Sequence, residues 1–106
     1  MKAKWITPVV TAFDKNGQID HKANKNIYDF LIDSGIDGIV IMGSTGEFFS
    51  MSMEQKKELI KLAVEYINDR TKLIVGTGDM SIDETIELSN FAYDNGVDSV
   101  MVIGPY

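Results

Sequence analysis

The strongest constraint on the fold of this chain is the regular alternation of short apolar runs with amphipathic stretches. The apolar runs follow one another without polar alternation, which is typical of parallel strands buried on both faces. The amphipathic stretches carry apolar residues at helical spacing. The predicted strands cover residues 5–13, 39–42, 73–75 and 100–103, so the predicted order is βαβαβαβ.

Polar residues and glycines indicate where the three predicted helices begin and end. Asp20 can cap the first helix, and Gly35 can end it. Ser52 opens a capping-box pattern before the second helix, and Ser81 opens a similar pattern before the third, which ends at Gly96. The predicted core-facing residues are Ala23, Ile27, Phe30 and Leu31, then Leu59, Ala63 and Tyr66 or Ile67, then Ile86, Ser89, Ala92 and Tyr93.

One segment of the sequence occurs twice. Residues 29–44 match residues 90–105 at a constant spacing of 61 residues, which is about the length of two helix-strand units. A repeat of this kind builds either a (β/α)8 TIM barrel or an open doubly wound sheet. The identical pairs are Phe30 and Phe91, Asp33 and Asp94, Gly35 and Gly96, Asp37 and Asp98, and Gly43 and Gly104.

The last predicted strand is followed only by Gly104, Pro105 and Tyr106, with no fourth helix. Parallel strands need cover on both faces, so four strands with three helices leave apolar surface open. We therefore expect residues 1–106 to be the N-terminal half of a single (β/α)8 barrel domain. The alternative is a small, complete α/β domain.

The composition limits the partners. A formal net charge of −6 does not suit nucleic acid or anionic membranes, which attract clustered Lys and Arg. The chain has no cysteine, and no apolar run approaches the ~20 residues of a membrane span. Carboxylates are scattered, so they outline no metal site. We expect a cytoplasmic protein that binds small molecules or other proteins.

The stretch MGSTGEFFS, residues 42–50, connects the second predicted strand to the second helix, where ligands bind in β/α folds. It is not a P-loop, because Phe48 stands where the second glycine is needed. It is not a nucleophile elbow, because Gly43 precedes Ser44 directly and no histidine follows. Two interpretations remain open: a pocket in which Ser44, Thr45 and backbone N–H groups bind a carboxylate, or an ordinary connection in which Glu47 is a structural hydrogen-bond partner.

Other candidate motifs are weaker. Residues 76–78, GTG, begin a dinucleotide fingerprint, but Ser81 replaces its third glycine, so a tight loop near a ligand or a neighbouring segment is the better interpretation. The side chains expected on solvated surface are His21, Lys56, Lys57 and Lys61.

Taken together, TPVVTAF at residues 7–13, GSTGE at 43–47, GTG at 76–78 and GPY at 104–106 resemble the dihydrodipicolinate synthase / N-acetylneuraminate lyase family over the whole chain. The resemblance implies a (β/α)8 barrel, a homotetramer and no cofactor. It implies a lyase that holds pyruvate as a Schiff base on a lysine and makes or breaks a carbon–carbon bond with an aldehyde.

The resemblance also assigns site residues. Ser44 and Thr45 would hold the pyruvate carboxylate, and Ser44 matches the hydroxyl of a proton relay between two tyrosines. Gly43, Gly46 and Glu47 would shape the loop, and Tyr106 would lie at a subunit interface. The Schiff-base lysine of the family lies beyond residue 106, so none of the lysines here matches it.

The second substrate is not fixed by these residues. A dihydrodipicolinate-type synthase, an N-acetylneuraminate lyase, a 2-keto-3-deoxy sugar acid aldolase and, from another class, a non-catalytic module that binds a small carboxylate remain alternatives. Feedback by lysine is not expected, because apolar or basic side chains replace polar ones of the family's effector site. The replacing residues are Phe48, Phe49, Met53, Lys56 and Met80; only Glu84 and Tyr106 agree.

Overall fold

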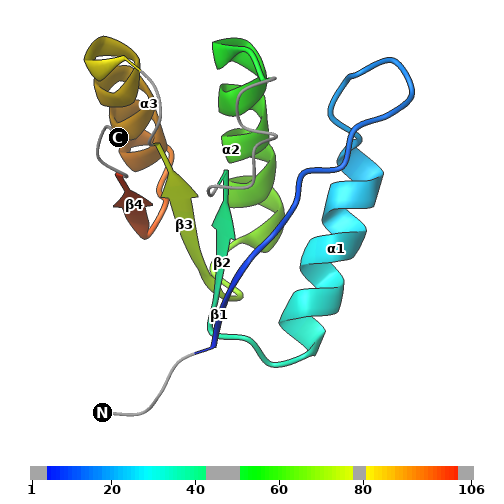
Figure 1. Cartoon of the computed structure of the whole chain (residues 1–106). Coiled ribbons are helices and arrows are strands. Elements are labelled where there is room, and N and C mark those ends of the chain that lie inside the picture. Colours follow the sequence, from blue (N-terminus) through cyan, green and yellow to red (C-terminus); the bar gives the residue numbers. More distant parts are fainter. Residues whose placement is uncertain (1–4, 43–50, 78–80, 103–106) are drawn as a thin grey trace.

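The computed structural model describes residues 5–42, 51–77 and 81–102, in which four parallel strands form one sheet in the order β1-β2-β3-β4 (Figure 1). Helices alternate with the strands along the chain, so the predicted order βαβαβαβ is confirmed. The strands are β1 (Ile6–Pro8), β2 (Gly38–Ile41), β3 (Lys72–Gly76) and β4 (Ser99–Met101), and the helices are α1 (His21–Asp33), α2 (Met53–Ile67) and α3 (Ile82–Asp94).

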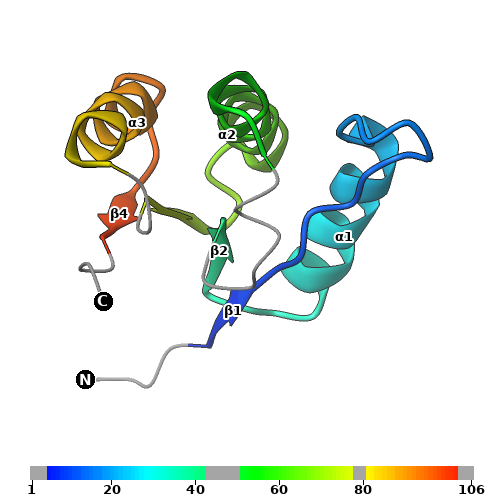
Figure 2. The same ribbon diagram turned by 45° about the horizontal axis from the view of Figure 1, so that its top comes forward.

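The strand order distinguishes between the two predicted architectures. Each strand pairs in parallel with the next strand in the sequence. Figure 2 shows all three helices on the same side of the sheet. An open doubly wound sheet reverses its strand order and places helices on both faces, whereas a (β/α)8 barrel keeps sequential order and one outer helical layer. The arrangement is therefore that of a barrel.

The first strand is much shorter than predicted. Regular pairing covers only Ile6–Pro8, and the N–H of Val9 adds one more bond to the carbonyl of Val40 at 3.0 Å. The prediction of a strand over residues 5–13 is wrong, because backbone groups beyond Val9 form hydrogen bonds with a side chain instead of a neighbouring strand. The N–H and carbonyl of Ala12 are bound by the side chain of Asn24, at 3.0 and 2.9 Å.

The predicted helix ends are confirmed. The Asp20 carboxylate accepts from the N–H of Ala23, and Ser52 forms a capping box with Gln55. Ser81 accepts from the N–H of Glu84 and starts α3. The glycines that follow α1 and α3, Gly35 and Gly96, have φ angles of +84° and +92°, the left-handed conformation that ends many helices.

The buried helix faces were predicted well only for α2. Its predicted residues Leu59, Ala63 and Ile67 are buried, because α2 lies between the other two helices and is covered on both sides. In α1, Phe30 is 70% exposed, whereas Tyr28 is buried. In α3 the predicted Ile86 and Tyr93 are exposed, whereas Leu88 is buried and Ala92 is buried as expected.

The sequence repeat has a structural meaning at the amino edge of the sheet. The N–H of Asp37 donates to the carbonyl of Trp5 at 2.7 Å, and the Asp37 carboxylate accepts from the N–H of Trp5 at 2.7 Å. The equivalent Asp98 makes the same two bonds with Leu73, at 3.0 and 2.8 Å. Each repeated aspartate thus ties the start of its own strand to the start of the neighbouring strand.

The burial of the sheet decreases from its centre to its edges. All four residues of β2 are buried, and Leu73, Val75 and Gly76 are buried in β3. The edge strands leave Ile6 in β1 and Met101 in β4 exposed. The apolar surface that the sequence predicted to stay open therefore lies on the two edge strands.

Candidate active site

The candidate site is at the carboxyl edge of the sheet, where the four parallel strands end and the connections to the helices begin. The connection from β2 to α2 leaves this edge and contains Ser44 and Thr45. These two residues, together with Gly43, Gly46, Glu47 and Tyr106, lie outside the described residues. Their roles therefore stay predictions, and the structure describes the residues that flank them.

Both ends of the predicted loop are fixed in the core. Met42, just after β2, is 2% exposed and has a φ angle of 55°, and Met51, just before α2, is also buried. A left-handed conformation at a residue other than glycine costs of order 1–3 kcal/mol, and such residues cluster at functional sites. The eight residues 43–50 are thus flanked in the sequence by two buried methionines.

The start of α2 is tied to the turn that follows the first strand. The Gln55 side chain accepts from the N–H of Ser52 at 3.2 Å and donates to the carbonyl of Gly17 at 3.0 Å. The Asp14 carboxylate organises that turn by accepting from the N–H groups of Asn16 and Gln18. One glutamine side chain therefore joins the end of the candidate loop to the segment after β1.

Lys56 contradicts its prediction as a solvated residue. Its side chain is buried, with a relative exposure of 6%, although it belongs to the first turns of α2. Burial lowers the pKa of the Lys56 ammonium, and the negative charge of Glu84 partly opposes this effect. The sequence signal for this burial is spacing. Lys56 lies three and four residues before the buried Leu59 and Ile60, so it belongs to the same face of α2.

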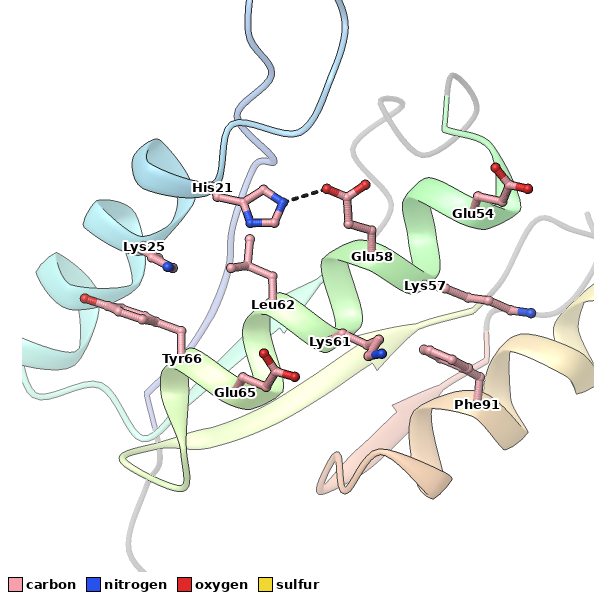
Figure 3. Close-up of a pocket in the computed structure, with 10 residues that line it drawn as sticks. All are labelled: His21, Lys25, Glu54, Lys57, Glu58, Lys61, Leu62, Glu65, Tyr66 and Phe91. Carbon is pink, nitrogen blue, oxygen red and sulfur yellow. Dashed lines mark hydrogen bonds and ion pairs between the residues drawn. The ribbon is translucent and has the colours of Figure 1, made fainter.

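A pocket of 730 Å³ lies on the outer surface of the helices rather than at the carboxyl edge (Figure 3). Two of its charged side chains have polar partners: Glu58 contacts the exposed His21 at 2.6 Å, and Lys57 contacts Glu87 at 2.7 Å. The pocket has the character of a charged helix surface, so it is not the candidate site. Its lining residues are His21, Lys25, Glu54, Lys57, Glu58, Lys61, Leu62, Glu65, Tyr66 and Phe91.

The described residues form neither a metal site nor a membrane-spanning helix. Among residues 5–42, 51–77 and 81–102, no group of three or more His, Cys, Asp or Glu side chains could hold a metal ion. No helix formed by these residues is long and apolar enough to cross a membrane.

A parallel sheet with sequential strands, one helical layer and a polar loop after the second strand is the amino-terminal arrangement of a β/α barrel. The chain belongs to the dihydrodipicolinate synthetase family, whose model matches residues 1–106. It is 39% identical over 105 residues to the 4-hydroxy-tetrahydrodipicolinate synthase of Ligilactobacillus salivarius (strain UCC118), covering 98% of this chain and 36% of that protein.

Solved structures agree with this assignment. The crystal structure of YagE, a prophage protein of the dihydrodipicolinic acid synthase family from E. coli K12 in complex with pyruvate, matches with a TM-score of 0.93 and 38% identity, over 97% of this chain and 35% of that one. N-acetylneuraminate lyase from Fusobacterium nucleatum matches with a TM-score of 0.91 and 27% identity, over 97% of this chain and 36% of that one. The chain spans about a third of the length of these relatives.

Proposed function

We propose that residues 1–106 are the amino-terminal half of the barrel of a lyase that condenses pyruvate, held as a Schiff base on a lysine, with an aldehyde. The narrow proposal is a 4-hydroxy-tetrahydrodipicolinate synthase. The observation that carries the pyruvate part of the proposal is family membership combined with the TM-score of 0.93 to YagE, whose crystal structure contains pyruvate. The narrow proposal is supported by the 39% identity to the 4-hydroxy-tetrahydrodipicolinate synthase of Ligilactobacillus salivarius. The GSTGE loop leaves β2 at the edge where barrels bind their substrates.

In this proposal Ser44 and Thr45 hold the carboxylate of pyruvate so that its keto carbon faces the lysine. Hydrogen bonds from hydroxyls to a carboxylate are charge-assisted and contribute about 1.5–3 kcal/mol each. Ser44 also passes a proton between two tyrosine hydroxyls. Gly43 and Gly46 let the backbone approach the ligand, and Glu47 holds the loop.

The lysine that attacks pyruvate is proposed to lie beyond residue 106, because no lysine of this chain matches the family's nucleophile. The 106-residue chain alone then forms no imine with pyruvate, since the attacking amine is missing. The complete protein is proposed to be a cytoplasmic homotetramer with Tyr106 at a subunit interface, and it uses no cofactor.

Borohydride trapping tests the proposal on the full-length protein. We expect reduction in the presence of pyruvate to add the mass of the reduced pyruvate adduct to a single lysine. The competing proposal, from another class, is a non-catalytic module that binds a small carboxylate through the same loop. Saturating pyruvate without any trapped adduct would favour that module and exclude the lyase.

Substitutions in the loop test the proposed roles of its hydroxyls. We expect Thr45→Val to raise the KM for pyruvate about tenfold or more, because a charge-assisted hydrogen bond is lost. We expect Ser44→Ala to raise the KM for pyruvate similarly and, in addition, to lower kcat about a hundredfold, because positioned proton transfer contributes factors of this order. Ser50→Ala is the matched control, since this hydroxyl of the same loop has no proposed role.

A second candidate reaction is supported by the match to N-acetylneuraminate lyase. N-acetylneuraminate lyase and 2-keto-3-deoxy sugar acid aldolase activities share the pyruvate half of the mechanism and differ in the aldehyde. Incubating the full-length protein with N-acetylneuraminate and with 2-keto-3-deoxy sugar acids, and measuring the pyruvate released, distinguishes them from the synthase.

A further inference from the structure

Thr77 lies at the carboxyl end of β3 and is fully buried, with 0% relative exposure. Each of its polar groups has a partner on another element. Its N–H donates to the carbonyl of Met101, the last residue of β4, at 2.9 Å. Its carbonyl accepts from the hydroxyl of Thr85 at 3.2 Å, and its own hydroxyl bonds to that of Ser89 at 3.2 Å.

These bonds join three elements at one point. Thr85 and Ser89 are four residues apart on α3, so they occupy the same face of that helix. The bond to Met101 carries the pairing of β3 and β4 one residue beyond the last register pair, Gly76 and Met101. Thr77 therefore fixes the carboxyl end of β4 against both β3 and α3.

We propose that Thr77 is a positioning residue for the reaction, a role that rests on the proposed function. Its main-chain N–H holds the carbonyl of Met101, and this fixes the carboxyl end of β4 at the edge of the sheet where barrels bind their substrates. Its two contacts with α3 keep that end from shifting. In this proposal the GTG motif at residues 76–78 contributes the positioning residue Thr77 and is not part of a dinucleotide fingerprint.

The expected kinetic signature is a change in turnover without a change in pyruvate binding. Ser44 and Thr45 follow β2, whereas Thr77 bonds to Thr85 and Ser89 on α3 and to Met101 on β4. We expect the loss of the Thr77 contacts with α3 to loosen the carboxyl end of β4 and to leave β2, the strand that precedes Ser44 and Thr45, unchanged. Small displacements of groups that orient reacting atoms reduce rates strongly.

The test uses the full-length protein and three variants at this point. Thr77→Val keeps the branched shape and removes the hydroxyl, and Thr85→Val removes the bond to the Thr77 carbonyl. We expect each to lower kcat about tenfold while the KM for pyruvate stays within about twofold. Thr77→Ser keeps the hydroxyl, so we expect it to retain most of the turnover.

Thr71→Val is the matched control at the opposite end of the same strand. The Thr71 hydroxyl donates to the carbonyl of Ile36 at 3.3 Å, so the same substitution removes a similar bond far from the carboxyl edge. We expect Thr71→Val to lower the melting temperature about as much as Thr77→Val and to leave kcat unchanged. This comparison separates positioning from general stability.

The possible results are distinct. Unchanged turnover in Thr77→Val, with normal trapping of pyruvate, overturns the role of Thr77 and leaves the proposed function intact. An equal loss of kcat in Thr71→Val overturns it as well, because the effect is then one of stability. If the unsubstituted protein traps no pyruvate, the proposed function itself fails.

Discussion

At the scale of single residues, buried polar side chains supply hydrogen bonds that the strands and helices do not. Asn24 is the clearest example: its side-chain amide is fully buried on α1. Its oxygen accepts from the N–H of Ala12 at 3.0 Å, and its nitrogen donates to the carbonyls of Ala12 and Asp20 at 2.9 and 2.7 Å. The side chain thus binds the backbone of Ala12 as a neighbouring strand would.

We expect Asn24→Ala to lower the free energy of unfolding by about 2–3 kcal/mol, because it leaves buried backbone groups of Ala12 without partners. Asn26→Ala is the control, since Asn26 is exposed on the same helix and the same atoms are removed. Urea unfolding followed by far-ultraviolet circular dichroism measures both variants. Equal losses in the two variants would show that the amide of Asn24 has no special role.

At the scale of elements, α1 and α2 are joined by a three-residue cluster on their outer surface. The hydroxyl of Tyr66 donates to the carboxylate of Asp29, and the Arg70 guanidinium donates to the same carboxylate at 3.1 Å. The Arg70 guanidinium also lies 5.0 Å from the centre of the Tyr66 ring. The hydrogen bond from Tyr66, followed by Arg70, lowers the pKa of Asp29 below its usual value of 3.8.

The lowered pKa predicts the pH dependence of stability. A carboxyl with a lower pKa in the folded state stabilises the fold above its unfolded pKa, and this contribution disappears as the pH falls through the folded pKa. We therefore expect Asp29→Asn to lower the melting temperature at pH 7, and we expect the difference from the unsubstituted protein to shrink as the pH falls below 3.8 toward the lowered pKa of folded Asp29. Asp33→Asn, an exposed carboxylate on the same helix, is the control. A difference that persists at acid pH would contradict the role of the ionised carboxylate.

The features that could be predicted from the sequence are those decided locally. Capping residues such as Asp20 and Ser52 act within a single turn, and the order of elements follows from the hydrophobic pattern. Burial depends on neighbours distant in the sequence, so the exposure of Phe30 and the burial of Lys56 were missed. The site was predicted through GSTGE as a motif, whereas the contacts of Thr77 join residues that no motif connects.

At the scale of the whole molecule, the chain forms a sheet with a buried centre and two exposed edges. β2 and β3 pair with strands on both sides, whereas β1 and β4 each pair on one side only in the described structure. Alternate residues of β2 and β3 belong to one core cluster with residues of the three helices; they are Ile39, Ile41, Leu73 and Val75. Met42 and Thr77, at the carboxyl edge of this sheet, therefore follow its two most buried strands.

We expect the full-length protein not to bind lysine as a regulator. An amino-acid effector requires polar partners for its charged groups, whereas most of the corresponding positions carry apolar side chains, Phe48, Phe49, Met53 and Met80. Isothermal titration calorimetry with lysine measures this directly, with pyruvate as the positive control. Micromolar binding of lysine would contradict the prediction.

The sequential strand order also bears on how the chain folds during synthesis. Each strand pairs with the one synthesised just before it, and each helix contacts the helix next to it in the sequence. Each parallel pair is closed by one helical crossover between consecutive strands, so no strand of the described sheet has to wait for a segment further along the chain. The sheet can therefore grow strand by strand as the chain leaves the ribosome, with each new β/α unit docking on the edge exposed by the last.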